Sequence, residues 1–67
     1  MKAIICKNYG DIDELECLDV DTPECKDNEV LISVAACGVN FPDTLIVQGK
    51  YQFKPNPPFS PGGEVSG

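Results

Sequence analysis

Apolar and polar residues alternate with a period of two along three stretches of the chain, residues 2–7, 14–20 and 29–36. This period is typical of β-strands, whose successive side chains point to opposite faces of a sheet. Residues 14–20 change phase between Cys17 and Leu18, which favours a bulge or a bend. Residues 64–67 resemble the first residues of another strand. We therefore expect a mainly β fold.

The period changes after Gly38, and the signals that follow predict one short helix over residues 42–48. Pro42 suits the first position of a helix, and Asp43 suits the positive end of the helix dipole. Gly49 can adopt the left-handed conformation that ends a helix. Four prolines within residues 54–61 exclude a further helix and predict an extended, mostly unpaired segment.

Composition is consistent with one small globular domain. The 67 residues are 42% hydrophobic and 24% charged, which is ordinary for a folded segment. A chain of this length buries only about 60% of the surface that it exposes when unfolded. Together with the predicted elements, this indicates part of a β-rich barrel with a small core.

The net charge of −6 argues against two classes of partner. The acidic residues are concentrated over residues 11–29, and such a surface repels nucleic acid and anionic membranes. The acidic region is either a solvated face or a docking surface for a basic partner. We find no targeting segment and no apolar run of membrane-spanning length, so we expect a cytoplasmic protein.

Four cysteines and the absence of histidine bear on metal binding. The cysteines, which are about ten residues apart and form no C-x-x-C pair, are Cys6, Cys17, Cys25 and Cys37. Without histidine they cannot complete a mixed zinc site, so no bound metal is expected. In a cytoplasmic protein they are expected to be reduced thiols that pack as small hydrophobic groups.

Periodicity and composition give no activity by themselves. The chain has no G-x-G-x-x-G between a strand and a helix, no phosphate-binding loop and no serine elbow. The pair Gly62 and Gly63 precedes a strand rather than a helix, so we expect a close backbone approach there instead of a phosphate cradle.

Three motifs together resemble one family, the zinc-free, zeta-crystallin-like quinone oxidoreductases of the medium-chain dehydrogenase/reductase superfamily. They are ACGVNFPDT at residues 36–44, GKY at residues 49–51 and PFSPGGEVSG at residues 58–67. The resemblance implies that residues 1–67 are the N-terminal part of a GroES-like catalytic domain, an incomplete barrel. It also implies that the Rossmann cofactor domain is absent from this chain, which alone would not be catalytically competent.

The same resemblance implies chemistry without zinc. In the zinc alcohol dehydrogenases of the superfamily, a cysteine and a histidine ligand stand where this chain has Asn40 and Gly63, and only Glu64 remains of that motif. The family reaction is hydride transfer from NADPH to a quinone or an activated enone, with the cofactor supplying the hydride. The resemblance implies a homodimeric parent enzyme.

Residues beside the nicotinamide follow from the resemblance as well. It places Asn40 in the cleft as a catalytic and cofactor-binding residue, with Asp43 and Thr44 as further cofactor contacts. Each has a structural alternative: Asn40 and Asp43 as helix-end groups, and Thr44 bonded back to the helix. Tyr51 either stacks on the planar substrate or covers the loop. Leu45 departs from the aromatic residue common in the family.

Three functions remain open at this point. The first is the N-terminal part of an NADPH-dependent quinone oxidoreductase, or of an enoyl reductase of the same superfamily. The second is a non-catalytic binding or structural module that keeps the GroES-like barrel. The third is a small co-chaperonin-like barrel, which the pattern around Asn40 and residues 62–64 disfavours. A glycine-rich βαβ motif downstream would distinguish the enzyme from the module.

Overall fold

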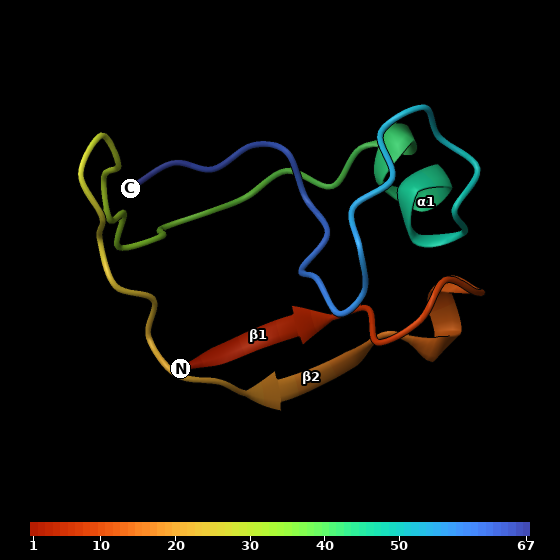
Figure 1. Cartoon of the computed structure of the whole chain (residues 1–67), viewed down its shortest axis with the longest axis horizontal. Coiled ribbons are helices and arrows are strands. Elements are labelled where there is room, and N and C mark those ends of the chain that lie inside the picture. Colours follow the sequence, from red (N-terminus) through yellow and green to blue (C-terminus); the bar gives the residue numbers. More distant parts are fainter.

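The computed structural model describes all residues, 1–67, and measures 31 × 23 × 22 Å. Its elements in chain order are strand β1 (Lys2–Ile5), the 3-10 turn η1 (Ile12–Glu14), strand β2 (Glu16–Asp19) and helix α1 (Phe41–Val47). In Figure 1 the β1–β2 hairpin lies along one side, and two extended segments, residues 30–40 and 60–67, run side by side opposite it. The first of them leads into α1.

The hairpin confirms the first two predicted strands but not the bulge. β1 and β2 pair antiparallel in an unbroken register, from Lys2 opposite Asp19 to Ile5 opposite Glu16. The apparent change of phase has another cause, because Leu15 ends η1 and lies outside β2. A residue outside the ladder need not follow the alternation of the strand, so no bulge is required.

The core is very small. Only Cys6 and Val47 are buried, at 1% and 2% exposure. The backbone of Cys6 exchanges two hydrogen bonds with Phe59, of 2.8 and 3.1 Å, and thereby joins the end of β1 to the proline-rich segment. The thiol of Cys6 packs as predicted. All four cysteines have free thiols, but Cys17, Cys25 and Cys37 are exposed rather than packed.

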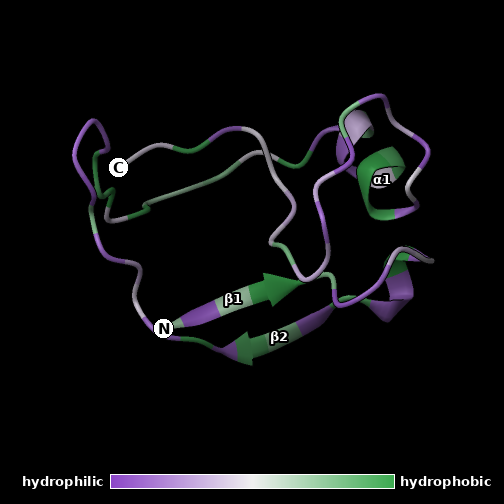
Figure 2. Cartoon of the chain, in the orientation of Figure 1, coloured by the Kyte–Doolittle hydropathy of each residue, from purple (hydrophilic) through white to green (hydrophobic).

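The predicted strand over residues 29–36 is wrong as a regular element. Figure 2 shows its hydrophobic colouring, yet Val30 is 82% exposed and Val34 57% exposed. The only ladder contact of this segment is an isolated antiparallel bridge between Ala36 and Ser66. The strand predicted over residues 64–67 is likewise reduced to this bridge. Alternation marks a face suited to burial, but a strand needs a neighbouring backbone along its length.

Helix α1 confirms the predicted helix, beginning and ending one residue earlier. Its end is a Schellman motif, in which Gly49 donates to the Ile46 carbonyl at 3.0 Å and Lys50 donates to the Leu45 carbonyl at 2.9 Å. Gly49 has a φ of +71°, as the sequence predicted. Apart from the bridge at Phe59, the proline-rich segment is unpaired, which is also as predicted.

The chain is thus β-rich with one short helix, around an open two-stranded sheet. No helix has the length and hydropathy needed to cross a membrane. The β1–β2 hairpin, α1 and the two extended segments surround the candidate site described below.

Candidate functional site

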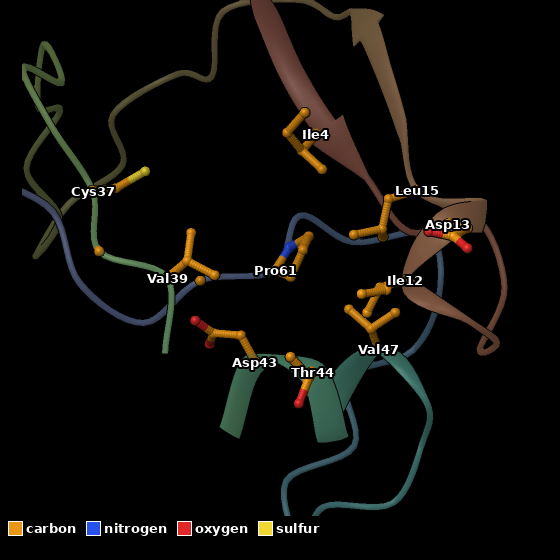
Figure 3. Close-up of a pocket in the computed structure, with 12 residues that line it drawn as sticks. Ile4, Ile12, Asp13, Leu15, Cys37, Val39, Asp43, Thr44, Val47 and Pro61 are labelled. Carbon is orange, nitrogen blue, oxygen red and sulfur yellow. The ribbon is translucent and has the colours of Figure 1, made fainter. Parts of the chain in front are cut away.

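A cavity of about 400 Å³ lies between β1, η1, α1 and the two extended segments (Figure 3). Its apolar lining comprises Ile4, Ile12, Leu15, Cys37, Val39, Val47 and Pro61, and the other residues that line it are Asp13, Gly38, Asp43, Thr44 and Gly62. A mostly apolar hollow of this size, with a few polar groups, has the properties of a site for a small organic molecule.

Asn40 occupies the N-cap position of α1, with extended backbone angles (φ −120°, ψ 162°). Its main-chain N–H donates to Asp43 Oδ2 at 2.8 Å, the contact by which the third helical residue of a capping box holds the cap. Its side-chain Nδ2 donates to Glu64 Oε1 at 2.6 Å. Asn40 is exposed and lies beside the cavity without lining it.

Asp43 and Thr44 both line the cavity from the first turn of α1. In Figure 3 the carboxylate of Asp43 extends toward Val39, whereas the hydroxyl of Thr44 turns away from the cavity. That hydroxyl donates to the Phe41 carbonyl at 2.7 Å. Asp43 therefore acts as a helix-end group and Thr44 bonds back to the helix, which are the structural alternatives considered from the sequence. Both residues also lie at the cavity wall.

Tyr51 lies apart from this group. It follows α1 in the loop, is half-buried and does not line the cavity. The structure therefore brings Asn40, Asp43 and Thr44 together over one turn of chain and leaves Tyr51 outside their cluster.

Glu64 and Gly38 complete the cluster, and sequence reasoning missed their contact. A Cβ built on Gly38 would lie 2.5 Å from Glu64 Cδ and 2.6 Å from its Oε2, so the carboxylate occupies space that only glycine leaves free. The expected close approach at Gly62 and Gly63 is wrong, because a Cβ at either would meet nothing within 4 Å. Glu64 is 24 residues from Asn40, so no pattern of neighbouring residues in the sequence predicts their hydrogen bond.

The polar side chains of the cluster are few and bonded to one another. No three side chains among histidine, cysteine, aspartate and glutamate are grouped so that they could hold a metal ion. Asn40 directs an N–H toward Glu64, and an N–H is a donor rather than a metal ligand. Asn40 retains a second N–H and its oxygen accepts up to two hydrogen bonds, so its amide can pair with a group that both donates and accepts.

Comparison with known proteins identifies the family. Residues 26–67, more than half of the chain, match the alcohol dehydrogenase GroES-like domain. Human quinone oxidoreductase is 41% identical over 68 aligned residues, which cover 100% of this chain and 21% of that protein. The human synaptic vesicle membrane protein VAT-1 homolog-like is 37% identical over 67 residues, covering 100% of this chain and 16% of that protein.

A solved structure agrees with these relatives. The quinone oxidoreductase of Thermus thermophilus, whose crystal structures include a complex with NADPH, matches with a TM-score of 0.88 at 43% identity. The match covers 97% of this chain and 21% of that one, so this chain spans about a fifth of the relative's length. The resemblance found in residues 36–67 is confirmed. The chain therefore belongs to the alcohol dehydrogenase GroES-like domain family, as a relative of the quinone oxidoreductases in the medium-chain dehydrogenase/reductase superfamily.

Proposed function

We propose that this chain is the N-terminal part of the catalytic domain of an NADPH-dependent quinone oxidoreductase that works without zinc. The observation that carries the proposal is the structural match to the Thermus thermophilus enzyme, at a TM-score of 0.88 and 43% identity. In this proposal a Rossmann domain outside residues 1–67 binds most of the cofactor. The cytoplasmic location and the homodimer expected from the sequence belong to the same proposal.

The proposed reaction needs little chemistry from the protein. NADPH, when bound, supplies a hydride to a quinone or an activated enone, and a proton from water completes the reduction. Asn40 orients the nicotinamide carboxamide or the substrate carbonyl through its amide, which both donates and accepts hydrogen bonds. Asp43 holds the backbone of Asn40 through the 2.8 Å bond.

The remaining residues shape the site in this proposal. Thr44 and the apolar side chains of the cavity pack beside the nicotinamide and keep water away from the transferring hydride. Tyr51 stacks on the planar substrate from the loop after α1. Zinc is not used, because Asn40 and Gly63 supply no thiolate or imidazole and Glu64 is bonded to Asn40.

The test follows NADPH absorbance with a simple benzoquinone, using the full-length protein that carries this segment. Wild type is expected to turn over in metal-free buffer with no bound zinc. Asn40→Ala is expected to lower kcat/KM by about tenfold or more, as the loss of a positioned hydrogen-bonding group does. Enone and enoyl thioester substrates in parallel assays distinguish an enoyl reductase.

A matched variant separates catalysis from helix capping. Serine also caps helices well, but it lacks the carboxamide, so Asn40→Ser is expected to keep the helix cap while losing the bond to Glu64 and the activity. If Asn40→Ser has wild-type activity while Asn40→Ala does not, the role of Asn40 is confined to capping the helix. A wild-type protein with neither nucleotide binding nor turnover would contradict the enzyme and favour a non-catalytic module.

A further inference from the structure

The side chains of Asn40 and Glu64 form a direct link between the start of α1 and the second extended segment. The Nδ2 to Oε1 distance is 2.6 Å, and the acceptor is a carboxylate. Hydrogen bonds to an ionised partner are about twice as strong as those between neutral groups. The amide plane of Asn40 is therefore held from outside its own helix.

Backbone pairing explains why Glu64 is available for this bond. Ser66 donates to the Ala36 carbonyl at 2.8 Å, and Ala35 donates to the Ser66 carbonyl at 2.7 Å. Ala36 and Ser66 face each other in an antiparallel bridge. Two residues further along each segment, the same register sets Gly38 opposite Glu64. The pairing of the two segments thus places the backbone of Glu64 opposite Gly38.

Gly38 then gives the carboxylate room. A Cβ at this position would lie between 2.5 and 2.9 Å from three atoms of the Glu64 carboxylate, far inside normal contact. Its backbone is outside the left-handed region, since no positive φ occurs there, so the requirement for glycine is steric and not conformational. A side chain at position 38 therefore requires the Glu64 carboxylate to move from the position in which it accepts from Asn40.

We propose that Glu64 is a positioning residue for Asn40, and that a glycine at position 38 leaves the space that the Glu64 carboxylate needs for this contact. With Nδ2 bonded to Glu64, Asn40 offers a ligand its oxygen and its second N–H. This acceptor and donor complement a primary carboxamide, the group carried by a nicotinamide ring. The inference rests on the proposed function and adds to it a second residue that determines how tightly the nicotinamide is held.

The experiment is a double-mutant cycle in the full-length protein, read by fluorescence titration of NADPH. Gly38→Ala and Glu64→Ala are each expected to raise the Kd for NADPH by about tenfold, the order expected for one charge-assisted hydrogen bond. The double variant is expected to be no weaker than Glu64→Ala alone, because the added methyl group then meets no carboxylate. Glu64→Gln keeps an acceptor oxygen and is expected to stay within about threefold of wild type.

Two measurements distinguish a positioning role of Glu64 from a merely structural one. Gly63→Ala is the matched glycine control, since its Cβ would meet nothing within 4 Å, and it is expected to leave the Kd unchanged. The side-chain NH2 resonance of Asn40 reports the hydrogen bond in the absence of cofactor. It is expected to shift in Glu64→Ala and in Gly38→Ala, but not in Gly63→Ala.

The outcomes distinguish this inference from the proposed function. NADPH binding by wild type with an unchanged Kd in Glu64→Ala would overturn the positioning role and leave the oxidoreductase in place. Additive effects in the double variant would also overturn it, because they would mean that Gly38 and Glu64 act independently. Absence of NADPH binding and turnover in wild type would overturn the proposed function together with this inference.

Discussion

At the scale of single residues, two glycines are required for different physical reasons. Gly38 is needed for space, because the Glu64 carboxylate fills the position of a Cβ. Gly49 is needed for its backbone conformation, a φ of +71° that ends α1. A Cβ at Gly49 would also lie 3.0 Å from Cγ of Tyr9, whose hydroxyl donates to the Pro55 carbonyl. Substitution at the second glycine therefore meets strain and crowding together.

Gly49→Ala is expected to lower the free energy of unfolding of the full-length protein by about 1–2 kcal/mol, since alanine is disfavoured at positive φ. Urea denaturation measures the change. Gly63→Ala is the control, because its backbone is outside the positive-φ region and its surroundings are open. Equal stability of the two alanine variants would show that the end of α1 does not depend on Gly49.

At the scale of elements, α1 is stabilised by its own ends. It has seven residues, too few for a stable isolated helix in water, and Val47 is its one buried residue. The capping contact from Asp43 to the Asn40 backbone and the Schellman motif at Gly49 satisfy groups that would otherwise lack partners. Such a short element therefore depends on each cap.

Asp43→Ala is expected to lower the free energy of unfolding by about 1 kcal/mol, because the capping bond and the favourable charge at the helix start are both lost. Asp43→Glu is the conservative comparison, since glutamate is well suited to the third position of a capping box. Urea denaturation of both variants is the measurement. An equal loss for alanine and glutamate would contradict the capping role.

The same pair of variants also bears on the site. If Asp43→Glu keeps stability while the Kd for NADPH rises, the carboxylate contacts the ligand in addition to capping α1. If stability and Kd both stay at wild-type values, its role is confined to the helix end.

At the scale of the whole molecule, hydrophobic side chains are mostly uncovered. Two of 67 residues are buried, and the large hydrophobic side chains that remain exposed include Val30 at 82%, Val39 at 84% and Phe41 at 73%. Apolar surface of this extent is typical of faces that are covered by other parts of a protein. Stability from burial is therefore small in the isolated 67 residues.

The isolated 67-residue chain is expected to unfold without a cooperative transition and to bind a hydrophobic dye such as ANS. Its open sheet edges and exposed apolar residues should also promote aggregation. Circular dichroism during heating, with light scattering as a control for aggregation, is the measurement. A sharp two-state transition and no dye binding would contradict this expectation.

Sequence alone determined the local elements. The proline-rich segment, the helix start near Pro42 and the stop at Gly49 follow from residue types within a few positions of one another. Family membership also followed from residues 36–67, because short motifs in a fixed order are specific. Asn40, Asp43 and Thr44 entered as candidate site residues only through that resemblance.

Tertiary structure decided the pairing of distant segments. The strand expected over residues 29–36 reduces to one bridge because alternation specifies a face and not the backbone that must lie beside it. The same non-local bridge, between Ala36 and Ser66, brings Glu64 to Gly38 and Asn40. Helix caps and turns depend on residues that are neighbours in the sequence, so the sequence predicts them. The hydrogen bond between Asn40 and Glu64 joins residues 24 positions apart, and it depends on how the two segments pair in the folded chain.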